Sequence, residues 1–272
     1  MQTTQNTYKI IFLDIDGTLT DSHKRIMPET LKALMNVQKN GVRLAIASGR
    51  PSKGVLPYAE ELQLDKYAGY ILPFNGGQII NYQTKETVYE NTLTMDIIKM
   101  AYNISKEYNT ELITYQGDCI LSETDDNPYL KIESEINKMD VIKVPSLLDA
   151  IKEMPVKCLM LGDGDYLGKI ESEIKEKMGH DANVFRSEPF FMEIVPNGID
   201  KAAAMEVLID KIGIKQSETM AFGDGYNDIS MVEYAGLGVA MSNGCNMIKQ
   251  VADRIADDNN SEGIAKIIAE VF

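Results

Sequence analysis

The sequence contains few residues of the kinds that form disulfides or soft metal sites. Among its 272 residues there are three cysteines and two histidines. Cys119, Cys158 and Cys245 are far apart and form no CxxC pair, which predicts reduced core thiols of a cytoplasmic protein and excludes a disulfide framework. His23 and His180 have no partner at ligand spacing, so we expect them at the surface or in loops.

Long apolar runs are also absent. No run approaches the roughly 18 apolar residues that a membrane-spanning helix requires. The first ten residues, MQTTQNTYKI, are polar and lack the apolar h-region of a secretory signal. We therefore expect no membrane partner and a cytoplasmic location.

Positive charge is scarce. The chain carries 27 Lys and Arg against 41 Asp and Glu, a formal net charge of −14. This balance excludes nucleic acid as a partner, because phosphate backbones are bound by clustered Lys and Arg. A single phosphate group can still be held inside an acidic protein by one or two cations and a metal. The imbalance is greatest between residues 84 and 193, with 12 Lys and Arg against 22 Asp and Glu.

Both ends of the chain alternate between strand-like and helix-like patterns. Near-continuous apolar runs predict buried strands, and 3–4 spacing of apolar residues between them predicts helices. Such alternation indicates parallel strands joined by crossover helices. The expected elements are strands at 8–14, 42–48, 70–75, 219–224 and 236–241, and helices from Pro28 to Gly41, to about Leu64, at 201–212 after an Asp200 cap, at 227–235, and from a Ser261 cap to Phe272.

The middle of the chain has a different rhythm, with a hairpin at 78–91 followed by mixed helices and strands. The predicted helices lie at 95–108, 128–138, 146–153 and 166–178. The predicted strands lie at 141–144 and 157–163, with a strand pair around 183–195. The fold class is therefore α/β: a doubly wound parallel, Rossmann-like core with an inserted α+β cap domain. We expect the core to span 1–83 and 194–272 and the cap to span 84–193, with hinges near 82–86 and 189–197.

Polar residues gather where the core strands end. Because ligands of parallel sheets bind beyond the carboxyl ends of the strands, we expect these side chains to meet at one edge. Four acids in one place repel unless a cation neutralises them, and an all-oxygen shell suits Mg²⁺. The candidate site residues are Asp14, Asp16, Ser48, Gly49, Arg50, Asn75, Gly76, Lys201, Asp224, Asn227 and Asp228.

Two loop motifs also have simpler interpretations. Asp14-x-Asp16 taken alone is also typical of a turn or a helix cap. A calcium loop is excluded, because Gly17 occupies the fourth position instead of the sixth and no Glu stands at the twelfth. GDGDYLG at 162–168 lacks the GK[ST] of a phosphate loop and predicts a tight turn.

Four segments in order carry a family resemblance: FLDIDGTLT, IASGR, GIDKAAAM and FGDGYND. They resemble the four motifs of the haloacid dehalogenase superfamily. The NGG at 75–77 and the large insert are similar to the Cof-type sugar-phosphate phosphatases of that superfamily. The resemblance covers essentially the whole chain, weakly through the insert.

The resemblance implies a role for each site residue. Asp14 would be the nucleophile, and Asp16 the acid and base that serves the leaving group and then water. Mg²⁺ would be held by Asp14, the backbone carbonyl of Asp16 and Asp224, with Asp228 orienting metal-bound water. The expected phosphate and substrate contacts are Ser48, Gly49, Arg50, Asn75, Gly76, Lys201 and Asn227.

The resulting hypothesis is a Mg²⁺-dependent phosphatase that acts on small phosphorylated metabolites, sugar phosphates first, through a phospho-aspartate intermediate. The acid at position 16 favours phosphoryl transfer over dehalogenation, since expulsion of a halide needs no proton. A phosphomutase of the same fold and a non-catalytic binding protein remain as alternatives. The cap would close over the active edge and choose the substrate. We expect a monomer or a weak homodimer.

Overall fold

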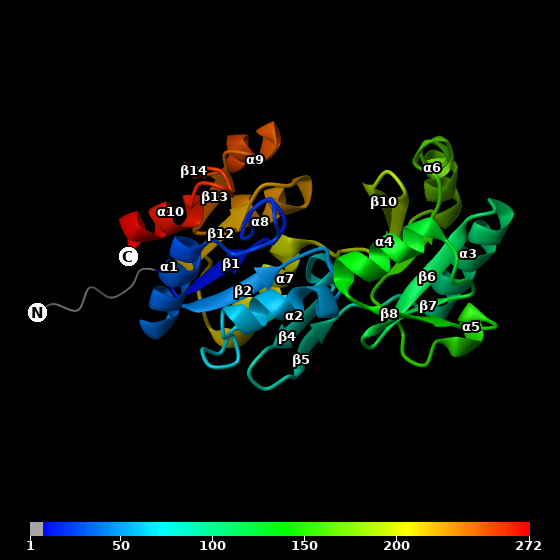
Figure 1. Cartoon of the computed structure of the whole chain (residues 1–272), viewed down its shortest axis with the longest axis horizontal. Helices are drawn as coiled ribbons and strands as arrows, with labels where there is room; N and C mark the ends of the chain where they lie inside the picture. The colour runs from blue at the N-terminus through cyan, green and yellow to red at the C-terminus, as the bar shows by residue number, and fades with distance from the viewer. Residues whose placement is uncertain (1–7) are drawn as a thin grey trace, which may run out of the picture. The chain divides into compact units, whose positions relative to one another are not determined.

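The computed structural model describes residues 8–272, which form two compact units (Figure 1). The first unit consists of the residues up to Gly49, Val55–Tyr89 and Asp200–Phe272, and the second of Arg50–Gly54 and Glu90–Ile199. Most of the polar start, on which the absence of a secretory signal was predicted, lies outside the described residues.

An eight-stranded sheet forms the centre of the first unit, with strand order β14-β13-β12-β1-β2-β3-β4-β5. The run from β14 to β3 is parallel, and β4 pairs with β3 in the antiparallel direction. This confirms the doubly wound parallel core. The strands are β1 (Ile10–Leu13), β2 (Arg43–Ala47), β3 (Tyr70–Leu72), β4 (Gln78–Asn81), β5 (Thr87–Glu90), β12 (Thr219–Gly223), β13 (Leu237–Met241) and β14 (Arg254–Ala256).

Helices cover both faces of this sheet because its strands are apolar on both sides. Ile11 and Leu13 of β1 pack with one set of helices, whereas Ile10 and Phe12 pack with the other. The first set is α1 (Pro28–Lys39), α2 (Ser52–Glu61) and α10 (Gly263–Val271); the second includes α7 (Lys201–Ile212) and α8 (Ile229–Tyr234). A short α9 (Asn246–Val251) packs beside α8.

The ends of α7 agree with the sequence, and the start of α10 does not. Asp200 accepts hydrogen bonds from the backbone N–H groups of Ala202 and Ala203, and Gly213 ends the helix with φ 69°. The expected Ser261 cap of the last helix is wrong. The N-cap is Glu262, whose carboxylate instead accepts the N–H groups that open α1, those of Glu29 and Thr30.

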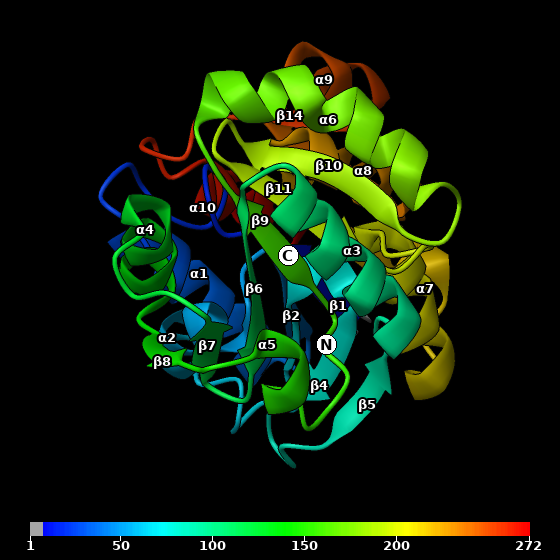
Figure 2. The same cartoon turned by 90° about the vertical axis from the view of Figure 1, so that its right-hand side faces the viewer.

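The second unit contains a six-stranded sheet with order β10-β11-β9-β6-β7-β8, antiparallel except between β7 and β8. Figure 2 shows α3 and α6 on this unit, and their apolar residues join one face of the sheet. The elements are α3 (Met95–Glu107), β6 (Glu111–Gln116), β7 (Cys119–Ser122), α4 (Pro128–Asn137), β8 (Asp140–Lys143), α5 (Leu147–Ala150), β9 (Cys158–Leu161), α6 (Gly164–Met178), β10 (Asn183–Glu188) and β11 (Phe191–Val195).

Two features of the second unit differ from expectation. The β6–β7 hairpin was not predicted at all, and GDGDYLG is no free turn, since Asp163 caps α6 by accepting from the N–H of Tyr166. The unit also begins and ends a few residues later than the expected 84–193. The cause is that β5 belongs to the first sheet, whereas β11 extends to Val195 in the second.

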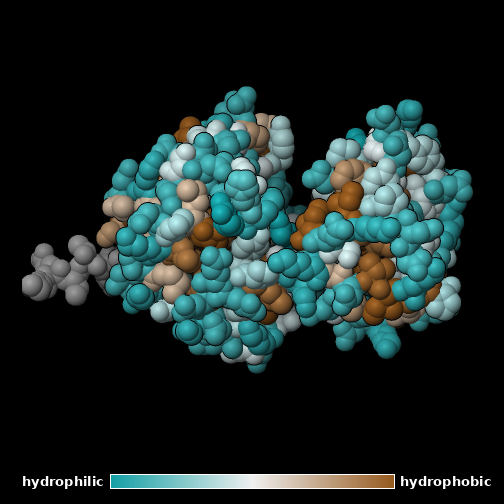
Figure 3. Space-filling view, viewed as in Figure 1, coloured by the Kyte–Doolittle hydropathy of each residue, from teal (hydrophilic) through white to brown (hydrophobic). Residues whose placement is uncertain are grey.

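The face seen in Figure 3 is hydrophilic over most of its area, with apolar side chains in separate patches. The large apolar residues that are exposed include Ile136 and Ile142 of the second unit. None of the helices formed by residues 8–272 has the length and apolar character needed to cross a membrane.

Candidate active site

Asp14 stands at the carboxyl end of the central strand β1. The four residues before it are fully buried, which places its carboxylate at the edge of the sheet with only 6% of the residue exposed. The chain then turns tightly: the N–H of Leu19 donates to the carbonyl of Asp14 at 3.1 Å, and that of Thr20 to Ile15 at 3.0 Å. This turn fixes the backbone of the whole first motif.

Asp224 reaches the same place from the end of the neighbouring strand β12. Thr18 Oγ1 donates a hydrogen bond to Asp224 Oδ1 at 2.7 Å. Gly17 is required between them for two reasons: its φ is +85°, and a Cβ there would overlap the Asp224 carboxylate. The glycine therefore lets the first motif approach the acid of the fourth.

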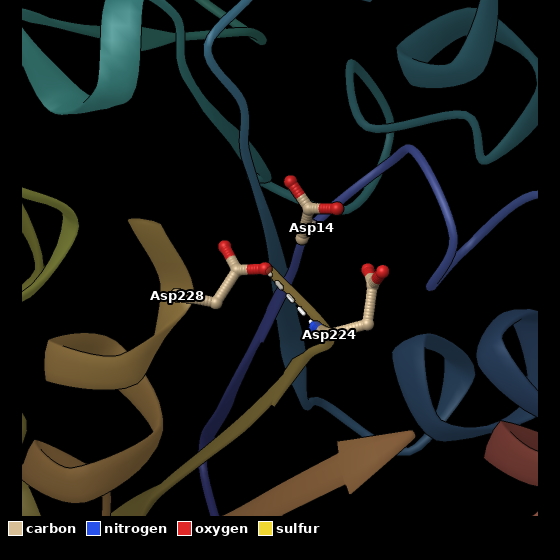
Figure 4. A group of neighbouring side chains, drawn as sticks. All are labelled: Asp14, Asp224 and Asp228. Atoms are coloured by element: carbon tan, nitrogen blue, oxygen red, sulfur yellow. Dashed lines mark hydrogen bonds between the residues drawn. The ribbon is translucent and has the colours of Figure 1, made fainter. Parts of the chain in front are cut away.

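Asp228, in a 3-10 turn (Tyr226–Asp228) after β12, supplies the third carboxylate. Its Oδ2 accepts the N–H groups of Asp224 at 3.0 Å and Gly225 at 2.9 Å. Figure 4 shows the first of these bonds and the carboxylates of Asp14, Asp224 and Asp228 gathered around one space. One ligand oxygen from each of the three lies within 4.8 Å of the others.

Lys201 opens α7 and is completely buried. Its Nζ donates to Asp14 Oδ1 at 2.6 Å and to Asp228 Oδ1 at 2.5 Å. Gly76, with φ +87°, makes the close packing of this helix possible, because a Cβ at that position would overlap Ala204. The position of Lys201 beside the acids therefore depends on how closely α7 packs against the loop after β3.

Burial and mutual repulsion shift the pKa values of these acids. Burial raises the pKa of Asp14 to about 8, with the negative charge of Asp228 adding to the effect and Lys201 opposing it. Burial also raises the pKa of Asp224 to about 6, against the hydrogen bond from Thr18. For Lys201 burial favours the neutral form, but Asp14 and Asp228 outweigh it and its pKa lies above the usual value.

The donor set fits a divalent cation. The cluster contains three acids, and Lys201 pairs with two of them, so it is short of positive charge; a hard ion such as Mg²⁺ prefers carboxylate oxygens. Of the four acids expected around the ion, the structure brings three together. The Asp16 side chain lies outside this cluster, where its Oδ1 pairs with Lys24 Nζ at 2.5 Å.

The loops that follow β2 and β3 lie at the same edge as the acids. Ser48, which follows β2, is buried and accepts the N–H of Asn75 on its carbonyl at 2.8 Å. The Asn75 side chain accepts in turn from Asn227 Nδ2 at 2.8 Å, and a Cβ on Gly49 would lie 3.3 Å from Asn75 Nδ2. The structure therefore connects Ser48, Gly49, Asn75 and Asn227. Arg50 groups with the second unit, so its substrate contact stays a prediction.

Three residues of the site were missed in the sequence. Thr18 lies inside the first motif and holds Asp224, and Asn243 donates to the carbonyl of Gly17 at 2.8 Å. Asn243 follows β13, so the same strand-end reasoning that found the acids would have found it. Lys24 comes from a loop between a strand and a helix and gives no such signal.

Comparison with known proteins agrees with this geometry. The sequence profile of the haloacid dehalogenase-like hydrolases matches residues 11–268. A crystal structure of a haloacid dehalogenase-like hydrolase from Bacteroides thetaiotaomicron is 42% identical, covers 97% of this chain and 100% of its own, and has a TM-score of 0.94.

Two further relatives have described activities. The 5-amino-6-(5-phospho-D-ribitylamino)uracil phosphatase YitU of Bacillus subtilis (strain 168) is 28% identical over 97% of both chains. The structure of the HAD subclass IIB sugar phosphatase BT4131 is 26% identical, covers 97% of this chain and 100% of its own, and has a TM-score of 0.81. The resemblance recognised in the four motifs is confirmed: the chain belongs to the haloacid dehalogenase-like hydrolases and is a phosphatase of that superfamily.

Proposed function

We propose that the protein hydrolyses small phosphorylated metabolites in a Mg²⁺-dependent reaction that passes through a phospho-aspartate on Asp14. The observation that carries the proposal is the buried Asp14 carboxylate, hydrogen-bonded to Lys201 and grouped with oxygens of Asp224 and Asp228 within 4.8 Å. A nucleophilic carboxylate with fixed positive charge beside it is what attack on an anionic phosphate ester requires.

Asp14 and Asp224 would hold the Mg²⁺ ion through carboxylate oxygens, together with the backbone carbonyl of Asp16. Asp228 suits a supporting position, because its Oδ2 already accepts two backbone N–H groups and its Oδ1 accepts from Lys201. When bound, the ion supplies positive charge that screens the nucleophile from the phosphate oxygens.

The chain's own residues carry the bond changes in two steps. An Asp14 oxygen attacks phosphorus; a P–O bond to Asp14 forms while the P–O bond to the leaving group breaks, and Asp16 gives its proton to the leaving oxygen. Water then attacks the same phosphorus and loses a proton to Asp16, the bond to Asp14 breaks, and inorganic phosphate is released. Lys201 stays on Asp14 and offsets its negative charge.

The phosphate oxygens would be held by donors from the loops that gather at the sheet edge. Ser48 Oγ and the N–H of Gly49 follow β2 directly, and Asn227 reaches the loop after β3 through Asn75. Arg50 and Gly76 complete the proposed contact set.

A sugar phosphate or related phosphorylated polyol is the proposed substrate class. Its support is that one relative is described as a sugar phosphatase and another acts on a phospho-ribityl compound. We assign the choice of metabolite to the inserted unit. A chimera in which residues 90–199 come from the Bacteroides thetaiotaomicron relative should adopt that protein's order of substrate preference while it keeps the Mg²⁺ requirement.

The decisive experiment is a panel of phosphorylated metabolites assayed for phosphate release with Mg²⁺ and with a chelator. We expect release with Mg²⁺ alone, and none from Asp14→Asn, which should fold normally. Acid-quenched wild type should carry an acyl phosphate on Asp14 that hydroxylamine removes. Undiminished turnover by Asp14→Asn, or by the chelated enzyme, would refute the proposal.

A further inference from the structure

We propose that Asn243 is a positioning residue that fixes the dimensions of the metal site and thereby its preference for Mg²⁺ over the larger Ca²⁺. The inference rests on the proposed function, in which Asp14, the carbonyl of Asp16 and Asp224 hold the ion. Asn243 lies in the loop 242–245, between β13 and α9, and supplies no ligand in that proposal. The four sequence motifs do not include it.

The Asn243 side chain holds the backbone beside one of the expected ligands. Its Nδ2 donates to the carbonyl of Gly17 at 2.8 Å, and its Oδ1 accepts the N–H of Asn259 at 3.1 Å. Glycine permits a wide range of backbone angles, so the direction of the Asp16 carbonyl, one peptide unit earlier, depends on what holds the unit after Gly17. Asn243 supplies a hydrogen bond to that unit.

The same loop contacts the backbone that carries Asp224. The N–H of Cys245 donates to the carbonyl of Asp224 at 2.9 Å. Gly244 packs so closely that a Cβ there would lie 2.9 Å from that carbonyl oxygen and 3.0 Å from the Asp224 Cα. Three consecutive residues, 243–245, therefore contact both segments that carry the expected ligands.

These contacts lie beyond the strand pairing that joins the two segments. The ladder between β1 and β12 extends to the N–H of Asp14, which donates to the carbonyl of Phe222 at 3.1 Å. Past that point the spacing of the segments depends on side chains and loops. Thr18 Oγ1 reaches the Asp224 carboxylate, which can rotate, whereas the loop 242–245 acts on the backbone of both segments.

The spacing of ligands decides which ion a site prefers. Mg²⁺ requires near-octahedral ligands at about 2.0–2.1 Å, whereas Ca²⁺ accepts ligands at about 2.3–2.6 Å in less regular arrangements. Loosening the segments that carry Asp224 and the Asp16 carbonyl therefore costs Mg²⁺ more than Ca²⁺. A role of Asn243 in folding alone would change the affinity for both ions by the same factor.

The rise of Tm with metal concentration measures both affinities without an activity assay. Chelator-treated protein is titrated with MgCl₂ or CaCl₂, and each curve gives an apparent Kd relative to the variant's own metal-free Tm. For Asn243→Ala we expect the Mg²⁺ Kd to rise about tenfold and the Ca²⁺ Kd by less than about twofold. Asp224→Asn, which lacks an expected ligand, shows how much of each rise comes from other acids of the chain.

Gly244→Ala disturbs the same loop from the side of Asp224. Gly244 has no positive φ, so the substitution adds no backbone strain, and its methyl group should displace the Asp224 backbone. The Mg²⁺ Kd should again rise about tenfold and the Ca²⁺ Kd by less than about twofold. The matched control is Asn91→Ala, in the second unit, where Nδ2 donates to the carbonyl of Asn197 at 3.1 Å; both Kd values should equal those of the wild type.

An unchanged ratio of the two Kd values in Asn243→Ala overturns the inference, whether both values rise equally or neither rises. The wild type and Asp224→Asn test the function on which the inference rests. If Mg²⁺ raises the Tm of the wild type and Asp224→Asn removes most of that rise, an unchanged ratio refutes only the role of Asn243. If Mg²⁺ does not stabilise the wild type, or stabilises Asp224→Asn equally, the proposed metal site fails, and the inference fails with it.

Discussion

Lys201 Nζ lies 2.6 Å from Asp14 Oδ1, although the two residues are 187 positions apart in the chain. The contact joins the end of the first strand of the core to a helix that follows the inserted unit in the sequence. Both side chains are buried, so water does not screen the pair. The ammonium of Lys201 is therefore brought to the nucleophile only when both ends of the chain have folded together.

Lys201→Met should remove activity and stability at the same time. Without the ammonium, Asp14 and Asp228 become buried carboxylates that lack this partner, a change that typically costs about 3–5 kcal/mol. The loss of charge beside the nucleophile should lower kcat about 100- to 1,000-fold. Urea unfolding in the presence of a chelator measures the first effect, and phosphate release measures the second.

The control for that prediction is Lys211→Met, on the same helix but exposed in its last turn. Its unfolding free energy should stay within about 0.5 kcal/mol of the wild type. Added Mg²⁺ should recover part of the stability of Lys201→Met, because an ion that binds only the folded state stabilises it. Equal stability of the two variants would show that the buried pair contributes nothing.

The metal-free protein should lose stability as the pH rises. The pKa of Asp14 is raised from 3.8 to about 8, and that of Asp224 from 3.8 to about 6. Between pH 3.8 and about 8 the folded protein therefore holds protons that the unfolded chain has released. The unfolding free energy then falls with increasing pH across this window. The measurement is Tm against pH from about 4 to 8 in chelator, for the wild type and for Asp14→Asn.

Asp14→Asn should decline less steeply than the wild type above pH 6, since the group that titrates there is gone. Excess Mg²⁺ should also flatten the wild-type curve, because the ion favours the ionised carboxylates. A wild-type curve that runs parallel to that of Asp14→Asn would show that Asp14 titrates normally.

The acids and the lysine of the site were predictable because strand ends are visible in the sequence. Asp14 and Asp224 each follow a buried apolar run, and parallel strands place such residues at one edge whatever lies between them. Lys201 was predictable from the Asp200 cap that precedes it. These signals are local in the sequence. They become informative about the site because the doubly wound fold brings the carboxyl ends of its parallel strands to one edge.

What the sequence did not reveal depends on contacts between distant segments. The Glu262 carboxylate accepts a backbone N–H at the start of α1 and caps no N–H of its own helix. No local sequence pattern predicts a side chain that caps a distant helix. Lys24 reaches Asp16 because a loop of irregular conformation brings it there. The predicted start of the inserted unit differs from the observed one because β5 pairs with the core sheet. The length of a strand does not indicate which sheet it joins.

Gly17→Ala should disable the site through geometry. The new methyl group would overlap the Asp224 carboxylate and would force an alanine into φ +85°. Gly41→Ala is a matched control, since Gly41 has φ +89° and nothing within 4 Å of a new Cβ. Both variants should lose about 1 kcal/mol or more from the backbone conformation.

Only Gly17→Ala should then lose activity, by at least about 100-fold, because Asp224 must move away from Asp14. Steady-state assays at saturating Mg²⁺, with a Mg²⁺ titration of each variant, measure the difference. If Gly41→Ala loses as much activity as Gly17→Ala, backbone strain and not the displaced carboxylate is the cause.

The inserted unit contains a buried ion pair whose loss should destabilise it. Lys157 on the approach to β9 and Glu193 on β11 lie 3.3 Å apart, with side chains 4% and 7% exposed. Lys157→Met should cost about 3–5 kcal/mol, because Glu193 keeps its charge in a buried place without that cation. Lys177→Met, which breaks an exposed pair with Glu107, should cost less than about 1 kcal/mol.

The double variant Lys157→Met/Glu193→Gln separates the cost of an unpaired charge from the cost of lost packing. It should recover a large part of the stability lost by Lys157→Met alone, since a neutral amide is cheaper to bury than a carboxylate. Urea unfolding of the wild type, both single variants and the double variant gives the coupling free energy. A coupling near zero would mean that water reaches the pair in solution, although the side chains of Lys157 and Glu193 are only 4% and 7% exposed.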